Sequence, residues 1–432
     1  MLSVQGQQSA GRSSLVSGTL VYLGANILNA LIPFILLPVL TRYLLPAEYG
    51  EVAIFQVLLS ALIGIVGLSV SGAAGRKFYD SEHDEAELAQ FIASCLQILM
   101  VSAGISLLVA LAFAAPLAQW LGLGLHWVIW AIIVAAATGV AQLRLSQWQV
   151  RKLPCQFGAF QVGQSALNFG LSLLLVVGLL LGAEGRIGAQ IFSALAFALL
   201  ALWSLWRDGL LVRWRLRRDY LEEVLRFGVP LMPHVVGNIL LMYFDRFIIN
   251  SVIGMSAAGL YMVAFQFSMA VMLVFTALNN AYVPWLYERL KRDDATEKGR
   301  IVRNTYLWFV VILCGAGLSF VVGPPLLRWI AGDEYAAAGD VIGILVLGQA
   351  FGGMYLMVTN YIFYSKKTGA LALATLVTGA VNILLLVVLV PSHGIIGAAI
   401  AFALAMALRF GLTWWVAQLR HPMPWFQLVK AG

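Results

Sequence analysis

The sequence predicts an all-α polytopic membrane protein with about 12 transmembrane helices, and three observations carry that prediction. Apolar residues make up 61% of the 432 positions and charged residues 11%, whereas a soluble domain has roughly 45–50% and 25%. Apolar runs of about 20 residues, the length that crosses roughly 30 Å of hydrocarbon as a helix, recur along the chain. The basic residues gather in every second connection between these runs.

The apolar runs form two sets of six. The spans of the first set are predicted at 18–40, 52–74, 88–114, 125–142, 157–181 and 187–206. Those of the second set are predicted at 227–253, 258–283, 305–330, 341–364, 370–390 and 395–416. We therefore expect five parts, in the order tail, first lobe, linker, second lobe and tail, at 1–17, 18–206, 207–226, 227–417 and 418–432.

The Lys and Arg positions predict the orientation. With 12 spans both termini share one side of the membrane, and that side holds 22 of the 27 basic residues. Cytoplasmic connections are the ones enriched in Lys and Arg, so we expect both termini in the cytoplasm and the protein in an inner (cytoplasmic) membrane. The membrane thus accounts for the net charge of +7, and no nucleic-acid partner is expected.

The linker at 207–226 interleaves Leu, Val, Trp and Tyr with Arg. This pattern is typical of a basic amphipathic helix on the anionic cytoplasmic leaflet, although a solvated charged face is the simpler interpretation. The halves on either side of it resemble each other, since the tripeptide Asn-Ile-Leu at 26–28 and Tyr49 both recur 212 residues later. Parallel repeats are a transporter feature that favours a substrate site between the lobes.

Few ionisable residues lie inside the spans, and a charge in hydrocarbon is costly, so each is a candidate functional residue. Asp245 and Arg246 lie in the seventh span, Arg409 in the twelfth and His234 near the cytoplasmic start of the seventh. Helical geometry puts His234, Asn238 and Asp245 on one stripe. Asp245 and His234 are the candidate coupling-ion or proton residues. Alternatively, Asp245 neutralises an arginine of a neighbouring helix.

Asn and Gln side chains form similar stripes in several spans, and such stripes together would line one hydrated cavity. The candidate cavity amides are Asn26, Asn29, Asn168, Asn238, Gln266, Asn280, Gln349 and Asn360. The alternative is that these amides only hydrogen-bond neighbouring helices, each contributing about 0.6–2 kcal/mol.

Neither a metal site nor a cofactor is expected. Cys95, Cys155 and Cys314 are far apart in the sequence and have no metal-ligand spacing, so we interpret them as packing residues. The sequence has no Walker A motif, GxxxxGK followed by Ser or Thr. Energy for transport would come from a gradient or from the downhill flow of the substrate.

Three stretches carry a resemblance to a known family. Residues 41–50 (TRYLLPAEYG) resemble the turn after the first span in bacterial polysaccharide flippases of the Wzx type, in which an Arg, a Pro and a closing Tyr-Gly or Phe-Gly recur. Residues 245–249 (DRFII), followed by Gly-Leu-Tyr at 259–261, are similar to that family's acidic-basic pair and later Gly-Leu-Tyr. Pro-Trp-Leu-Tyr at 284–287 also fits. Wzx-type proteins belong to the multidrug/oligosaccharidyl-lipid/polysaccharide exporter superfamily.

The resemblance implies two six-helix lobes around a central cavity that opens alternately to each side. It implies a cargo of undecaprenyl-pyrophosphate-linked oligosaccharide, moved from the cytoplasmic to the periplasmic leaflet, with Arg42, Arg246 and Arg409 among the cavity residues. Buried arginine suits a pyrophosphate because its planar fork matches phosphate oxygens. The implied partners are the lipid-linked glycan, the bilayer and other polysaccharide-assembly membrane proteins, around a monomeric transporter.

Two other functions compete with this one. A drug or organic-cation antiporter of the same superfamily would want several buried carboxylates, but only Asp245 lies deep in a span. A membrane polysaccharide polymerase or ligase would want a large periplasmic loop with catalytic residues, and the predicted periplasmic connections are short. The sequence therefore favours a transporter that is not an enzyme.

The orientation is testable with added cysteines. A cysteine near Asp219 should be shielded from a membrane-impermeant thiol reagent in intact cells, and one near Gly182 should be labelled, because the charge pattern puts the first in the cytoplasm. Opened cells, in which both should react, serve as the control. Labelling of both positions in intact cells, or of Asp219 alone, would contradict the orientation.

Overall fold

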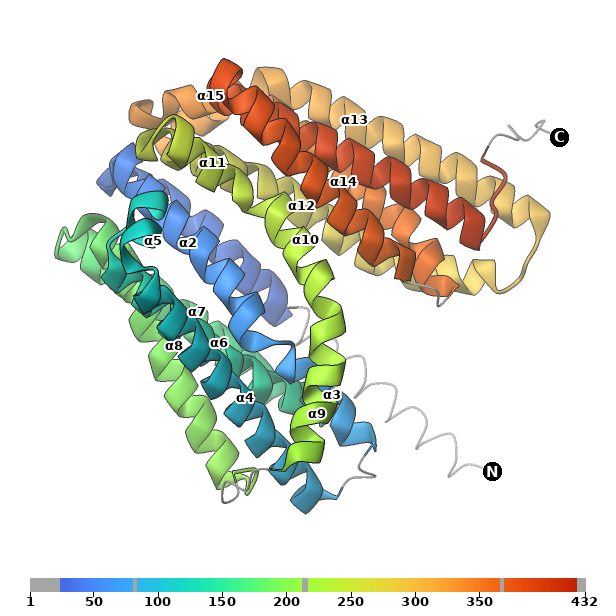
Figure 1. The fold of residues 1–432 in the computed structure, drawn as a ribbon. Helices are drawn as coiled ribbons and strands as arrows, with labels where there is room; N and C mark the ends of the chain where they lie inside the picture. The colour runs from blue at the N-terminus through green and yellow to red at the C-terminus, as the bar shows by residue number, and fades with distance from the viewer. Residues whose placement is uncertain (1–23, 81–83, 212–216, 366–368, 426–432) are drawn as a thin grey trace, which may run out of the picture. The chain divides into compact units, whose positions relative to one another are not determined.

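The computed structural model describes residues 24–80, 84–211, 217–365 and 369–425, and these ranges are helical apart from short connections and contain no β-strand (Figure 1). A first helix at Gly24–Tyr43 precedes α2 (Pro46–Gly67), α3 (Val70–Asp80), α4 (Glu85–Ala112), α5 (Ala114–Leu121), α6 (Leu125–Val150), α7 (Pro154–Ser172), the π-helix η1 (Leu173–Gly178) and α8 (Gly182–Arg207). Then come α9 (Arg218–Gly228), the 3₁₀ turn η2 (Val229–Leu231), α10 (Met232–Met242), α11 (Phe244–Val252), α12 (Met255–Leu290), α13 (Ala295–Ala331), the 3₁₀ helix η3 (Asp333–Ala338), α14 (Gly339–Tyr364) and α15 (Gly369–Arg420).

The number of spans agrees with the sequence. Within the described ranges, 11 helical stretches are long and apolar enough to cross a membrane. The last of them, α15, has 52 residues, far more than the roughly 20 that one crossing needs. Its helix is interrupted at Gly394, where φ is 60° and ψ is −140°, between the two spans predicted at 370–390 and 395–416. The predicted all-α fold of about 12 transmembrane helices is therefore confirmed.

Local signals in the sequence fix several helix ends. Asp84 precedes α4 and its carboxylate accepts hydrogen bonds from the backbone N–H of Ala86 and Glu87. Asp294 does the same for α13 through Thr296. Both aspartates satisfy N–H groups that a helix start leaves unpaired. Gly122 ends α5 in the left-handed conformation at φ 66°, which glycine adopts without steric cost.

Of the residues that the structure describes, those in 24–36 and 55–232 form one compact unit. In this first unit α6 packs against α3, α4 and α8, and α7 packs on α8. Arg144 of α6 is 1% exposed; its Nε donates to Ser204 Oγ at 3.0 Å, and its guanidinium pairs with Asp208 at the end of α8. The buried cation is thus neutralised where two helices meet.

The second unit holds the described residues of 37–54 and 233–425. Its central helix is α14, which packs against α12, α13 and α15 (Figure 1). Aromatic side chains close one end of this bundle, where the Tyr306 hydroxyl donates to the backbone oxygen of Trp425 at 2.9 Å. The rings of Phe309, Phe410 and Trp414 contact one another there. Burial of such rings stabilises the packing of α13 on α15.

Two glycines explain why residues 37–54 belong to the second unit. A Cβ added at Gly50 would lie 2.0 Å from the backbone oxygen of Met255, and one at Gly259 would lie 1.9 Å from that of Pro46. The first turns of α2 and α12 therefore touch backbone to backbone. Tyr49 and Tyr335 complete this contact, because the Tyr49 hydroxyl donates to Gln266 at 3.0 Å and the Tyr335 hydroxyl to the backbone oxygen of Leu44 at 2.7 Å.

The seventh span differs from the continuous helix predicted at 227–253. Helical structure begins earlier, at Arg218 in the second half of the predicted linker, and α9, η2 and α10 follow one another without a loop. The helix is then interrupted at Tyr243, where φ is −131° and ψ is −25°, and α11 follows. Sequence periodicity missed this interruption because residues 239–249 stay apolar enough to continue a helix.

The glycine contact yields a stability prediction. Gly259→Ala should lower the free energy of unfolding by about 1–3 kcal/mol, because the methyl group would overlap a backbone oxygen that has to move. The apparent Tm of the purified protein in detergent measures the effect. Gly411→Ala is the matched control, since a Cβ there has no atom within 4 Å, and it should not lower Tm. An unchanged Tm for Gly259→Ala would contradict the close contact.

Candidate functional site

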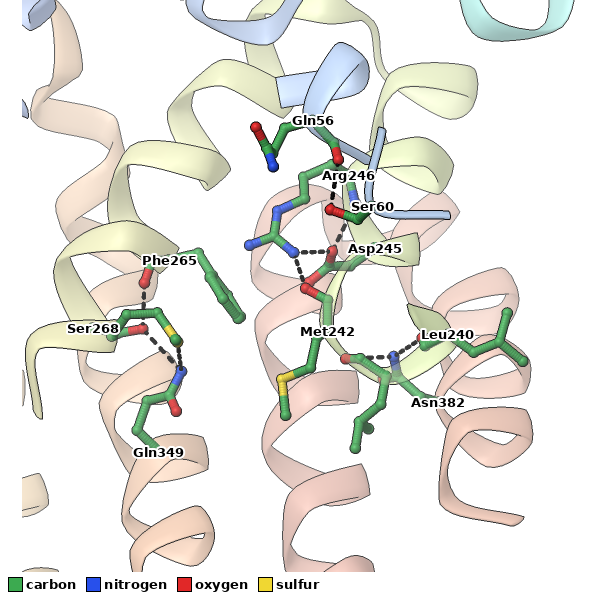
Figure 2. A network of polar contacts seen from close by, with 12 residues as sticks. Gln56, Ser60, Leu240, Met242, Asp245, Arg246, Phe265, Ser268, Gln349 and Asn382 are labelled. Atoms are coloured by element: carbon green, nitrogen blue, oxygen red, sulfur yellow. Dashed lines mark hydrogen bonds and ion pairs between the residues drawn. The ribbon is translucent and has the colours of Figure 1, made fainter. Parts of the chain in front are cut away.

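The interruption at Tyr243 is stabilised by side chains from other parts of the second unit (Figure 2). Asn382 of α15 donates from Nδ2 to the backbone oxygen of Leu240 at 3.1 Å. The guanidinium of Arg246 donates to the backbone oxygen of Met242. A helix end inside a bilayer leaves carbonyl groups that water cannot reach, and these two side chains supply the missing donors. Broken helices of this kind form the substrate and ion sites of many transporters.

Two glycines bring α10 close enough to α15 for the hydrogen bond from Asn382 to Leu240. A Cβ added at Gly379 would lie 2.7 Å from the backbone oxygen of Gly237, and one at Gly237 would lie 3.0 Å from Cα of Leu376. Small residues permit such close approach of helices in membranes. The next residue along α10 is Asn238, so its amide lies at the α10–α15 contact.

Asp245 and Arg246 form a buried ion pair on α11. Asp245 is fully buried and Arg246 is 2% exposed. Oδ1 of Asp245 accepts hydrogen bonds from the backbone N–H and from the guanidinium of Arg246, both at 2.8 Å. The guanidinium lies 3.9 Å from the ring centroid of Phe265 on α12, a cation–π distance. The pair therefore balances its own charge, and Asp245 neutralises the arginine next to it in sequence.

Arg409 of α15 lies in a different environment. Its side chain is buried, and Nη2 donates to Asn238 Oδ1 at 3.4 Å and to the Tyr355 hydroxyl at 3.3 Å. The guanidinium lies 4.2 Å from the ring centroid of Tyr355, and its Nε has no hydrogen-bond partner among the described residues. His234 lies in the same cluster, with Nε2 3.1 Å from Asn238 Nδ2.

Arg409 differs from the other buried arginines of the described chain in the charge of its partners. Within the described parts of the chain, three arginines are buried: Arg144, Arg246 and Arg409. The first pairs with Asp208 and the second with Asp245. In the same described ranges no carboxylate forms an ion pair with Arg409, and its two hydrogen bonds go to neutral groups at long distances. A buried cation of this kind calls for an anion.

Three of the predicted cavity amides in the second unit bond to neighbouring helices. Gln349 donates to Ser268 Oγ at 3.4 Å, Asn360 donates to Asn279 Oδ1 at 2.8 Å, and Gln266 accepts from Tyr49. These contacts are those of amides that hold helices together. A substrate role for them stays a prediction.

The remaining predicted residues have mixed environments. In the first unit Asn29 accepts a hydrogen bond from Ser165 Oγ, and Asn168 accepts one from Arg186 at 2.8 Å. The side chains of three others are exposed: Arg42, Asn26 and Asn280. The structure therefore brings together His234, Asn238 and Arg409 but leaves the other candidates in separate contacts.

Sequence reasoning missed three residues of the second unit. Asn382 is the only Asn or Gln in the predicted span 370–390, so its isolation was an available signal. Asn279, and not its exposed neighbour Asn280, bonds to Asn360, and periodicity without a measured helix phase does not separate adjacent amides. Tyr355 gave no signal, since a tyrosine in an apolar span fits ordinary packing equally well.

Comparisons with known proteins relate this chain to polysaccharide biosynthesis. The sequence pattern of the family described as "Polysaccharide biosynthesis protein" matches residues 15–289. Over 394 residues the chain is 25% identical to Lsg locus putative protein 1 of Haemophilus influenzae, covering 88% of this chain and 94% of the relative. Over 390 residues it is 21% identical to the probable low-salt glycan biosynthesis flippase Agl15 of Haloferax volcanii, covering 89% and 79%.

Solved structures share the fold. The lipid II flippase MurJ in an inward closed conformation superposes with a TM-score of 0.72 at 13% identity, covering 93% of this chain and 87% of that one. An inward-facing multidrug resistance transporter of the MATE family and MOP superfamily gives a TM-score of 0.71 at 13% identity, covering 93% and 97%. The fold is therefore shared about equally with a flippase and with a drug exporter.

The buried ion pair yields a second stability prediction. Asp245→Asn should lower the free energy of unfolding by about 3–5 kcal/mol, because it leaves Arg246 as a buried cation without a carboxylate. Combining it with Arg246→Gln should recover the part of that loss that comes from the unpaired charge, because glutamine is neutral, while the part that comes from the guanidinium bond to the Met242 carbonyl stays lost. Both are measured as apparent Tm in detergent.

The control for this pair is Asp333→Asn, which breaks the exposed ion pair with Arg328 at 2.5 Å. That change should alter stability by less than about 1 kcal/mol. An Asp245→Asn protein as stable as the control would exclude a structural role for the pair. Transport by the stable double variant then tests coupling, since parental rates would show that no proton at Asp245 is needed.

Proposed function

We propose, since the chain belongs to the polysaccharide biosynthesis protein family, that it is a flippase for undecaprenyl-pyrophosphate-linked oligosaccharide. The resemblance to Wzx-type flippases drawn from residues 41–50 and 245–249 is confirmed at the level of the family. In this proposal the protein works in the bacterial inner membrane with both termini cytoplasmic. It moves its substrate from the cytoplasmic to the periplasmic leaflet by alternating access, coupled to a gradient.

The observation that carries the proposal is the buried guanidinium of Arg409 without a carboxylate. A pyrophosphate presents several anionic oxygens, and an arginine fork binds two of them with short, charge-assisted hydrogen bonds. The bonds that Arg409 makes to Asn238 and Tyr355 are 3.4 and 3.3 Å long. The usual donor–acceptor distance of an N–H···O hydrogen bond is about 2.7–3.2 Å. Exchanging them for phosphate oxygens would cost little.

Arg246 is the weaker candidate for the headgroup contact. Its guanidinium is already shared between Asp245, the backbone oxygen of Met242 and the ring of Phe265. A phosphate would have to compete with a carboxylate 2.8 Å away. Its role in substrate binding stays a prediction, and its observed contacts favour holding the interruption at Tyr243 in place.

His234 is the coupling residue that this geometry favours. It is linked to Arg409 through Asn238, and imidazole is the side chain that gains or loses a proton near neutral pH. Protonation of His234 would place a second positive charge beside Arg409 and strengthen its attraction for an anion. Release of the proton would weaken it, which connects a proton gradient to headgroup binding and release.

The alternative of a drug or organic-cation antiporter has less support. The multidrug resistance transporter superposes on this chain about as well as the lipid II flippase does, so the fold does not decide between the two functions. Organic cations need a buried carboxylate that is available to them, whereas Asp245 is already paired with Arg246. Among the described residues of the second unit, the buried charge that has no counter-ion is that of Arg409, which is positive and suits an anionic cargo.

Substitutions at Arg409 test the headgroup contact. In a flippase-null strain, Arg409→Ala should reduce export of surface polysaccharide by about tenfold or more, since a hydrogen bond to a charged group contributes about 1.5–3 kcal/mol. Arg409→Lys should rescue poorly, because lysine keeps the charge but lacks the fork. Export is quantified alongside membrane levels by immunoblot.

Arg292→Lys is the matched control, because Arg292 is exposed in the turn after α12 and pairs only with Glu288, four residues earlier, among the described residues. It should export normally. If Arg409→Lys also exports normally while Arg409→Ala does not, the residue supplies only charge. Full export from Arg409→Ala would exclude the headgroup role.

A further inference from the structure

The second unit contains an apolar pocket separate from the Arg409 cluster. It has a volume of about 410 Å³ and is lined by α12, α13 and α14. Its side chains come from 271–282 of α12, 308–319 of α13 and 346–357 of α14, the middle parts of three spanning helices. The pocket therefore lies at the depth of the hydrocarbon core.

The packing of the three helices creates this pocket. α12 and α13 each pack extensively on α14 but make few contacts with each other, so α14 forms the floor and the other two form the walls. A Cβ at Gly353 would meet the ring of Phe275 at 2.5 Å, so that glycine seats Phe275 directly against the floor. A Cβ at Gly315 would have no atom within 4 Å, which shows that the α13 wall is open at that point.

The chemistry of the lining selects the occupant. Most lining groups are apolar, with Phe275, Tyr282 and Trp308 as the aromatic ones, and Asn279 is engaged by Asn360. Protein interiors hold few voids larger than a water molecule, and an apolar cavity does not attract water. Pockets that bind small molecules have volumes of roughly 300–1,000 Å³. A pocket of this size and depth suits a segment of hydrocarbon chain.

We propose that this pocket binds part of the isoprenoid tail of the lipid carrier while the headgroup is held elsewhere. The inference rests on the proposed function, because the carrier's tail is the lipid chain that a flippase of this kind has to accommodate with each substrate. Aromatic side chains offer large apolar contact areas, and Phe275 and Trp308 provide them to the tail. Trp308 is 43% exposed, so the described chain leaves this side of the pocket uncovered.

Photolabelling tests the occupant directly. The full-length protein in lipid nanodiscs is irradiated with a diazirine-bearing polyprenyl phosphate, and the labelled peptides are identified by mass spectrometry. We expect labels within 271–282, 308–319 or 346–357 that unlabelled polyprenyl phosphate removes and excess phosphatidylglycerol does not. A diazirine-bearing phosphatidylglycerol is the second probe. Equal labelling by that probe, uncompeted by polyprenyl phosphate, would overturn the isoprenoid assignment in favour of ordinary acyl chains.

Filling the pocket provides the matched pair of variants. Gly315→Leu puts a side chain into the open part of the wall and should weaken polyprenyl labelling about tenfold, equivalent to roughly 1.4 kcal/mol of binding. Gly317→Leu adds the same side chain two residues away, at a glycine that is outside the pocket lining and also has no atom within 4 Å of its Cβ. It should label like the parent. Unchanged labelling in Gly315→Leu, or absence of polyprenyl labelling in the parent, would refute the proposal.

Export separates this inference from the function on which it rests. Suppose that Arg409→Ala is defective in export, while a Gly315→Leu protein reaches the membrane and exports normally. That result would contradict the tail pocket but leave the flippase proposal standing. A parent protein that restores no surface polysaccharide in the flippase-null strain would reject the flippase proposal itself. Polyprenyl labelling confined to the pocket, together with reduced export from Gly315→Leu but not from Gly317→Leu, would support both.

Discussion

The absence of water from a bilayer core is the constraint on which the second unit depends. Each backbone carbonyl that leaves a helix in hydrocarbon needs another donor, at a cost of several kcal/mol if it finds none. The seventh span is interrupted at Tyr243, and the side chains of Asn382 and Arg246 donate to carbonyls beside the interruption. The interruption, the α10–α15 contact and the position of Asn238 therefore form one interdependent arrangement.

The same constraint acts on charge. A cation buried among spans is tolerated when it is paired, as Arg144 is with Asp208 and Arg246 with Asp245. Arg409 is bonded only to neutral groups within the described chain, so its burial is stabilised less by the protein itself. A residue that is costly for the fold and suited to an anion is a reasonable place for substrate recognition, because a passing phosphate would supply what the fold lacks.

Backbone contact at glycines explains the residues that carry the family resemblance. Gly50 closes the Tyr-Gly motif and Gly259 opens Gly-Leu-Tyr, and each occupies a position where a Cβ would overlap the other helix's backbone. Tyr49 adds a hydrogen bond to Gln266 beside this crossing. These motif residues therefore hold α2 against α12, which is a packing role. The candidate recognition residue, Arg409, lies outside all of the motifs.

The sequence by itself determined the number of spans, because a stretch of about 20 apolar residues has few alternatives to a membrane helix. It also identified Asp245, Arg246 and Arg409 as charged residues inside the spans, since their cost is independent of their partners, but it left Arg144, which is buried in α6, outside the predicted span 125–142. Tertiary structure alone decided which of them are neutralised. Arg409 meets Asn238 across 171 positions, and Asn382 reaches Leu240 across 142. Hydrophobic periodicity is a property of one helix, whereas the donor that permits an interruption, or the carboxylate that balances a cation, belongs to whichever helix packs beside it.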